Sequence, residues 1–305
     1  MKIILVTHCS SRKTEAPRKS LRAAELVPGP VDRVAAVWLQ RVGRVKRRFP
    51  ARELYTGVGA GLIKRVAQKT GVPWYLVSAG HGLVYAHARI PSYDLSVGSD
   101  RSSVVRKLKP RGKVTASTWW MELTAQKDPE PLRRLIERRK DALVIIALSA
   151  CYLKMIAPEL EKLDASSLAR VRIVGAKTSI ISTKLHPVVM PYDARLNSRN
   201  STARGGQVTF AQRAALHFVG LLASDKRFRS LASHAHLVQH ALQRLRAPCR
   251  AQRKRVSDRA IQVLIRRLQR KSIDSPGVAL QVVRKTHLVA CEESRFRRIW
   301  DAVAA

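Results

Sequence analysis

The hydrophobic residues of this chain gather in short continuous runs, each bounded by polar residues or glycine. Such runs occur at residues 3–6, 74–77, 143–148, 171–174 and 188–190. A continuous apolar run of this kind between turn-forming residues is typical of a strand that is buried on both faces. The pattern therefore predicts a buried strand at each of these positions.

Segments with helical spacing of apolar residues lie between and after the predicted strands. They occupy residues 31–48, 61–69, 131–139 and 152–163, and a last one at 208–224 has Thr209 as a candidate N-cap. Strands that alternate with helices favour a mainly parallel sheet, because parallel neighbours need a crossover connection. The predicted fold class is α/β, with a mainly parallel sheet and flanking helices.

The pattern changes after residue 224. The segments that follow are helical and basic and contain no convincing strand, so we predict a first domain at 1–224 and a basic all-α domain at 225–305. The end of the chain divides into a helix near 278–284, a turn near 286–288 and a helix near 291–303, which is compatible with a helix-turn-helix. An ordinary helical bundle with solvated arginines is the alternative.

The charge balance points to a polyanionic partner. The 305 residues include 58 Lys and Arg against 21 Asp and Glu, a net charge of +37, which ion pairs within the protein cannot neutralise. Nucleic acid is the leading candidate, since each phosphate that pairs with Lys or Arg releases condensed counterions. We expect DNA as the partner, and RNA stays open as an alternative.

The cysteines Cys9, Cys151, Cys249 and Cys291 are widely spaced and form no C-x-x-C pair. This spacing argues against a zinc ribbon or a redox motif, so we expect reduced thiols and neither a metal nor another cofactor. The first apolar run is too short for a signal peptide, and no run approaches the length of a membrane span. We expect a soluble, cytoplasmic protein that does not bind membranes.

Loops that leave the carboxyl ends of parallel strands gather at one edge of the sheet, where α/β proteins usually bind ligands. The first such loop, residues 7–14, contains Cys9, Ser11, Arg12 and Lys13. Its hydroxyls, backbone amides and cations could hold a phosphate. A solvated basic turn is the alternative, and Cys9 is more simply a packed thiol than a nucleophile because spacing sets no partner base for it.

The second loop carries the largest group of candidate site residues. Ser78 ends the preceding strand, Gly80 permits close approach of the backbone, and His81 follows. Tyr93 offers a flat face on which a base could stack, and Asp94 could act as a general base or stabilise positive charge that develops on a sugar ring. As an alternative, Asp94 caps the next helix or turn.

The third loop, residues 192–210, is dense in Asn, Ser and Arg. Asn197 and Asn200 could bind a base edge or position water, and Arg204 could bind a phosphate. A flexible polar linker is the alternative for this stretch. Tyr55 stands in a glycine-rich segment that is a weak phosphate signal, because it lacks the Lys-Ser/Thr of a P-loop.

Three stretches of the first hundred residues together resemble a known family. "HCSSRKT", "ARELYTGVGAGLIKRVA" and "WYLVSAGHGLVYAHARIPSYDLS" are similar to the Cys-Ser-x-x-Lys, Leu-Tyr-x-Gly, Leu-Ser-x-x-x-Gly-Leu and Pro-Tyr-Asp motifs of the YaaA-like bacterial and phage domains. Here Ser92 is inserted between Pro91 and Tyr93. The resemblance implies DNA binding and an association with modified bases, and it suggests Asp94 and the strand-end residues as members of the active site.

The sequence also resembles anti-phage DNA glycosylases that remove glucosylated hydroxymethylcytosine and leave an abasic site. We therefore expect an N-glycosylase in which Asp94 supports the attack of water on a flipped nucleotide, while His81, Asn197 or Asn200 binds the leaving base. One alternative is a non-catalytic DNA-binding stress or nucleoid protein. Another is a deazaguanine-type base-exchange enzyme that acts on tRNA or DNA.

Overall fold

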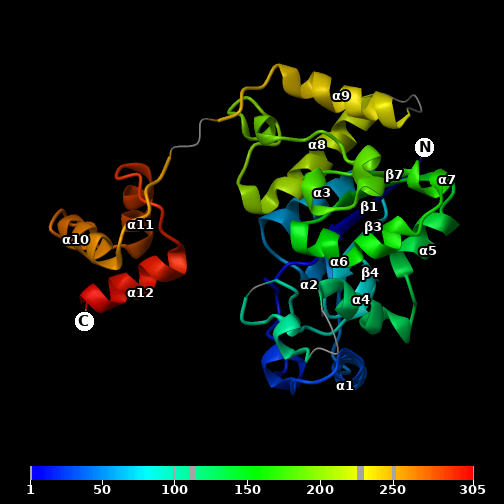
Figure 1. Cartoon of the computed structure of the whole chain (residues 1–305), viewed down its shortest axis with the longest axis horizontal. Coiled ribbons are helices and arrows are strands. Elements are labelled where there is room, and N and C mark those ends of the chain that lie inside the picture. Colours follow the sequence, from blue (N-terminus) through cyan, green and yellow to red (C-terminus); the bar gives the residue numbers. More distant parts are fainter. Residues whose placement is uncertain (1, 99, 110–114, 225–229, 249–251, 305) are drawn as a thin grey trace. The chain divides into compact units, whose positions relative to one another are not determined.

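The computed structural model describes residues 2–98, 100–109, 115–224, 230–248 and 252–304 (Figure 1). The chain forms two compact units, Met1–Pro248 and Cys249–Ala305. The first unit contains the sheet and the predicted site loops, and the second contains helices. Within the described residues, no helix has the length and apolar character that crossing a bilayer requires.

A five-stranded sheet forms the centre of the first unit, in the order β4-β3-β1-β6-β7. Its members are β1 (Lys2–His8), β3 (Trp74–Ser78), β4 (Gly82–Tyr85), β6 (Ala142–Ala147) and β7 (Val171–Ile173). β1 pairs in parallel with β3 and β6, and β6 with β7, whereas β4 returns antiparallel to β3. The α/β class with a mainly parallel sheet is thus confirmed.

The strand predicted at residues 188–190 does not form. A 3-10 segment, Thr183–Val188, occupies its start, and Val189 makes only an isolated bridge to Ile173. Pro187 and Pro191 flank this run, and proline cannot donate a hydrogen bond to a ladder. The four other predicted strands are present.

The helices of the first unit are α1 (Val31–Gly43), α2 (Ala51–Leu54), α3 (Val58–Thr70), α4 (Ala116–Ala125), α5 (Pro131–Arg138), α6 (Ala150–Glu161), α7 (Ala165–Leu168), α8 (Phe210–Ser224) and α9 (Leu231–Gln243). Five of them, α1, α3, α5, α6 and α8, lie at the positions where the periodicity predicts them, whereas α2, α4 and α7 were not predicted. Short 3-10 segments occur at Lys19–Leu21, Ala23–Glu25, Val104–Lys107, Thr178–Ile180, Ala194–Asn197 and Gln207–Thr209. A two-residue strand, β2 (Phe49–Pro50), pairs antiparallel with β5 (Arg89–Ile90).

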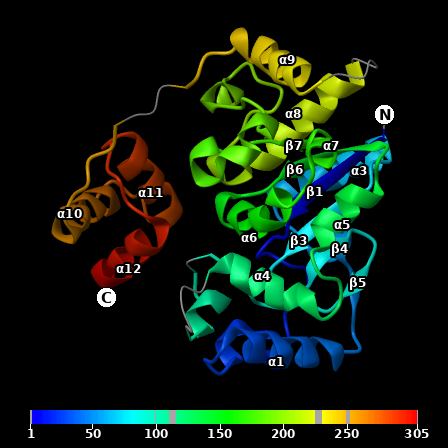
Figure 2. The same cartoon turned by 45° about the vertical axis from the view of Figure 1, so that its right-hand side comes forward.

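Helices cover both faces of the sheet. α3 and α8 pack together on one side, and α4 and α6 pack together on the other (Figure 2). β6 lies between these layers, and all of its residues are buried. An uninterrupted apolar strand is what a parallel sheet with both faces covered requires.

The order of the parallel strands places a topological switch point between β1 and β6. The chain leaves β1 toward β3 on one side, and it leaves β6 toward β7 on the other. Loops that leave such neighbouring strands diverge and open a crevice at their carboxyl ends. The ends of β1 and β6, at His8 and Ala147, are therefore the expected floor of a site.

The boundary between the units differs from the predicted one at 224/225. α9 belongs to the first unit, because Val238 and Leu242 are fully buried in the same core as the sheet. On the same helix, His234 accepts a hydrogen bond from Arg172 of β7 (Nε to Nδ1, 2.8 Å). Residues 225–229, where the sequence pattern changes, lie outside the described residues.

The second unit has a separate hydrophobic core. Its helices are α10 (Asp258–Gln269), α11 (Pro276–Lys285) and α12 (Glu293–Ala304), and Ile261, Ile265, Val283 and Phe296 are fully buried among them. α11 and α12 coincide with the helix pair predicted near 278–284 and 291–303. DNA binding through this pair remains a prediction.

Candidate active site

A buried cluster of hydroxyl and thiol groups lies at the carboxyl ends of β1 and β3. Tyr93 Oη is its centre, at 2.8 Å from Ser78 Oγ, 3.0 Å from Tyr55 Oη and 3.3 Å from Cys9 Sγ. Tyr152 Oη, from the first turn of α6, lies 3.1 Å from the same sulfur atom. We call Cys9, Tyr55, Ser78, Tyr93 and Tyr152 the tyrosine–cysteine cluster. Four of its members were predicted as site residues, and the fold brings them together.

The tyrosines of this cluster are held in the protonated form. Burial raises the pKa of Tyr93 and Tyr152 well above the usual range, and Cys9 raises both further. Burial likewise raises the pKa of Tyr55. Neutral hydroxyl groups that bond to each other and to Ser78 form a rigid support beneath the crevice, rather than a set of proton acceptors.

The structure does not support two predicted roles, the stacking of a base on Tyr93 and the use of Gly80 for close approach to a ligand. Tyr93 is 1% exposed, so it offers no free face to a base. Lys13 Nζ lies 4.2 Å from the centre of its ring, and a Cβ atom on Gly80 would lie 2.7 Å from two of its ring carbons. Gly80 is therefore needed for packing against Tyr93. The same glycine accepts a hydrogen bond from Trp38 Nε1 through its carbonyl oxygen (2.7 Å).

Asp94 is held in place by its backbone, and its side chain is partly exposed. Its amide donates to Leu21 O (2.8 Å), and its carbonyl accepts from Ala23 N (2.7 Å). Among the described residues, its carboxylate has neither a hydrogen bond nor an ion pair. A fixed backbone with an unpaired carboxylate leaves this side chain available to a ligand.

Lys13 is a cation that contacts the tyrosine–cysteine cluster. Burial lowers its pKa, and its electrostatic interactions with Cys9 and Asp94 act in the opposite direction. Its ammonium also lies 5.7 Å from the ring centre of Tyr55. Lys13 thus contacts the buried cluster and also interacts electrostatically with the partly exposed carboxylate of Asp94.

His81 is neutral at physiological pH. Its Nε2 lies 3.2 Å from Pro91 O, and because a carbonyl only accepts, this nitrogen carries the proton. Burial lowers the pKa of His81 to about 3, although the bond to Pro91 acts in the other direction. Its ring also packs edge-on against Tyr93 at 4.7 Å. These contacts give His81 a positioning role, and a protonated imidazole is not available for catalysis at neutral pH.

The third predicted loop, residues 192–210, is hydrogen-bonded to the start of α8 instead of to the tyrosine–cysteine cluster. Asn197 Oδ1 accepts a hydrogen bond from Arg213 Nη2 (2.7 Å), and Arg213 also donates to Ala203 O and Gly206 O. These bonds tie the loop to the start of α8. Asn200 and Arg204 are exposed, and no hydrogen bond or ion pair joins them to the tyrosine–cysteine cluster in the part of the chain that the structure describes.

Ser11 and Arg12 are exposed at the entrance of the first loop. Arg12 O accepts a hydrogen bond from Thr56 N (3.0 Å), which fixes this loop beside the start of α3. At Gly57, the residue before α3, a Cβ atom would lie 3.5 Å from Ser10 Oγ. The backbone there has φ of +103°, which favours glycine. The loop and the glycine-rich segment thus lie side by side at this edge of the sheet.

Sequence reasoning missed His8, Tyr152 and Gln212. Ser149 N donates to His8 Nδ1 (3.2 Å), His8 stacks on Tyr152 at 5.2 Å, and the Gln212 amide lies 3.1 Å from His8 Nε2. Burial lowers the pKa of His8 to about 4. A polar residue on the apolar face of a helix was the available signal for Gln212, which is 5% exposed.

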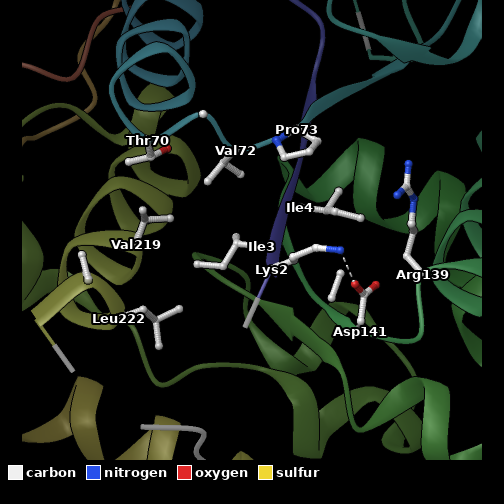
Figure 3. A pocket seen from close by; sticks show the side chains of 13 residues that line it. Lys2, Ile3, Ile4, Thr70, Val72, Pro73, Arg139, Asp141, Val219 and Leu222 are labelled. Atoms are coloured by element: carbon white, nitrogen blue, oxygen red, sulfur yellow. Dashed lines mark ion pairs between the residues drawn. The ribbon is translucent and has the colours of Figure 1, made fainter. Parts of the chain in front are cut away.

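A large cavity lies at the opposite, amino-terminal edge of the sheet (Figure 3). It has a volume of about 730 Å³ and is lined by Ile3, Val72, Val219 and Leu222 among others. Lys2 and Asp141 form an ion pair at this cavity (2.7 Å), and Figure 3 shows them side by side. Much of its lining is aliphatic, and its lysine and aspartate are paired with each other.

Comparison with known proteins adds one match. Residues 42–166 match a described protein family, DUF6884. Its description is a family of unknown function. The DUF6884 match includes Tyr55, Ser78, Tyr93, Asp94 and Tyr152, and it excludes β1, β7 and α8. No curated protein and no solved structure matches the chain.

Proposed function

We propose that this protein is a DNA N-glycosylase that hydrolyses the bond between a modified base and its sugar. The observation that carries the proposal is Asp94, which follows Tyr93 of the tyrosine–cysteine cluster, and whose backbone is fixed and carboxylate unpaired among the described residues. Perturbed ionisable groups near such a carboxylate are typical of catalytic sites, and Lys13 and His81 provide them here. The resemblance to YaaA-like domains and anti-phage glycosylases gives the substrate class.

In the proposed reaction, Asp94 and Lys13 act as the bond between the sugar and the base breaks. As the bond from C1′ to the base nitrogen breaks, its electron pair leaves with the base and positive charge develops on the sugar ring. The Asp94 carboxylate stabilises that charge and accepts a proton from the water that attacks C1′. The ammonium of Lys13 donates a proton to the leaving base. The products are an abasic site and the free base.

The net charge of +37 supports a polyanionic substrate. Exposed arginines recur on the second unit, where Arg259, Arg266 and Arg267 lie on α10. Contacts of this kind bind phosphates without regard to sequence and weaken steeply as salt increases. The second unit therefore supplies affinity for DNA in this proposal, and the first unit supplies the chemistry.

The test uses phage DNA that carries hypermodified bases. Purified wild-type protein is incubated with it, released bases are identified by mass spectrometry, and alkali converts abasic sites to strand breaks. Asp94→Asn should lower the rate of base release by about 100-fold or more, as expected for loss of a general base. Its affinity for the DNA should not change.

Asp32→Asn is the matched control, because Asp32 is an exposed aspartate on α1 and should retain full activity. Release of no base from any modified DNA, together with tight binding, would reject the enzymatic proposal. It would favour a non-catalytic DNA-binding protein, for which the basic second unit would be sufficient. Full activity of Asp94→Asn would reject the role of this carboxylate.

A further inference from the structure

Gln212 is a buried amide that is only half satisfied. It is 5% exposed, and one of its amide atoms faces His8 Nε2 at 3.1 Å. Its other amide atom is buried and has no hydrogen-bond partner within the described ranges. A buried polar atom without a partner is costly, so such atoms in native proteins usually serve a ligand or an ordered water.

The hydrogen bonds of His8 determine which amide atom of Gln212 lacks a partner. His8 Nδ1 accepts a hydrogen bond from Ser149 N, so the neutral imidazole carries its proton on Nε2. Gln212 Nε2 faces this N–H in the structure, but two donors cannot bond to each other, and the two ends of a glutamine amide are exchanged by a half turn. We therefore assign the oxygen of Gln212 to the side that faces His8. The NH2 group of Gln212 then occupies the unpaired position and can donate to a ligand.

Two helix N-termini lie near the Gln212 side chain, that of α3 in direct contact and that of α6 through His8. Gln212 lies in the first turn of α8, and a Cβ atom on Gly59, in the first turn of α3, would lie 3.3 Å from its Cδ. Ser149 is the N-cap of α6, and neither α3 nor α6 has a side-chain cap hydrogen bond. The N-terminus of a helix carries partial positive charge and unpaired N–H groups that favour anions.

We propose that Gln212, together with the N-termini of α3 and α6, forms a binding site for a phosphate group of the nucleotide that enters the crevice. The site lies at the switch point between β1 and β6, and Ser10 and Arg12 lie beside the residue that precedes α3. Phosphate oxygens only accept hydrogen bonds, which matches an amide NH2 group and free backbone N–H groups. This inference rests on the proposed function for the identity of its ligand.

The test compares deoxycytidine 5′-monophosphate with deoxycytidine as probes of the full chain, by calorimetry at physiological salt. The nucleotide should bind roughly tenfold more tightly than the nucleoside, as expected for hydrogen bonds to a charged group. Gln212→Glu should reduce this ratio to about 1, because it places a carboxylate where the phosphate binds. Gly59→Ala should reduce it as well, because the added methyl group displaces the Gln212 amide.

Gly61→Ala is the matched control. It changes the same kind of residue in the same helix, but its Cβ atom would meet only Arg65 Nη1 at 3.7 Å, so the ratio should stay at its wild-type value. Thermal unfolding of each variant checks that it is folded. Equal binding of the two probes, no binding of either, or an unchanged ratio in Gln212→Glu and Gly59→Ala would overturn the inference. The last result would mean that the amide serves a water molecule only.

Base release from modified DNA is a separate readout. A nucleotide preference that depends on Gln212, without release of any base, would keep the phosphate site and reject the glycosylase. Base release by a protein that shows no such preference would keep the enzyme and reject the phosphate site.

Discussion

The two partly buried histidines His8 and His81 make the stability of the first unit depend on pH. Burial lowers the pKa of His8 to about 4 and that of His81 to about 3, from 6.5. In the unfolded chain both imidazoles bind a proton near pH 6.5. The unfolded state therefore binds more protons than the folded state below pH 6.5, and stability decreases as the pH falls.

The size of the effect follows from these pKa values. One pKa unit corresponds to about 1.4 kcal/mol, so His8 loses about 3 kcal/mol and His81 about 5 kcal/mol once the pH is below both folded values. Between pH 7 and pH 5 each histidine loses about 2 kcal/mol, and together they lose about 4 kcal/mol. Most carboxylates titrate below this interval, so the histidines dominate it. A loss of this size is a large part of the stability of a typical domain.

Urea unfolding at pH 7, 6 and 5 measures this loss. Tryptophan fluorescence is a suitable signal, and Trp300→Phe removes the one tryptophan of the second unit and leaves those of the first, Trp38, Trp74, Trp119 and Trp120. In this background the free energy of unfolding should decrease by about 4 kcal/mol from pH 7 to pH 5. His81→Gln keeps a donor for Pro91 O but does not titrate, so it should halve the decrease.

His240→Gln is the control, because His240 is exposed on α9 and its replacement should leave the pH dependence as it was. A free energy of unfolding that changes by less than about 1 kcal/mol between pH 7 and pH 5 would refute the reasoning from burial. An undiminished decrease in His81→Gln would refute the assignment to His81.

Two further predictions concern packing and loop structure, and urea midpoints check both. Gly80→Ala forces a methyl group to 2.7 Å from the Tyr93 ring and should cost about 1 to 3 kcal/mol, whereas Gly43→Ala, with no atom within 4 Å of the new Cβ, should not destabilise. Asn197→Ala removes the acceptor of a charged donor and should cost about 1 to 3 kcal/mol, whereas Asn200→Ala, at an exposed position, should change stability by less than about 0.5 kcal/mol. If Gly80→Ala and Gly43→Ala had equal effects, the packing of Gly80 against Tyr93 would be contradicted. If Asn197→Ala and Asn200→Ala had equal effects, the contribution of the hydrogen bond between Asn197 and Arg213 would be contradicted.

The hydrophobic runs were sufficient to predict four of the five strands of the central sheet, because strands that are buried on both faces are mostly apolar, whereas the edge strand β4 was not predicted. The runs that become β1, β3 and β6 have this property, and β7 has it except at Arg172, a buried charged residue that donates to His234. The run at residues 188–190 has it too and is not a strand, since its flanking prolines remove hydrogen-bond donors. The domain boundary was placed too early, because the charged stretch after α8 precedes a helix, α9, whose apolar face still packs on the first unit.

The local sequence determined that Cys9, Ser78 and Asp94 lie near strand ends, because the residue types at the end of a strand are visible in the chain itself. Only the tertiary structure decided which of them meet and which are exposed. Tyr93 and Asp94 are neighbours in sequence, yet the first is enclosed by Gly80 and Lys13 while the second keeps an unpaired carboxylate. Whether a side chain is buried, and which residue it contacts, depends on residues far apart in the chain, such as His8 and Gln212. No local pattern specifies such contacts.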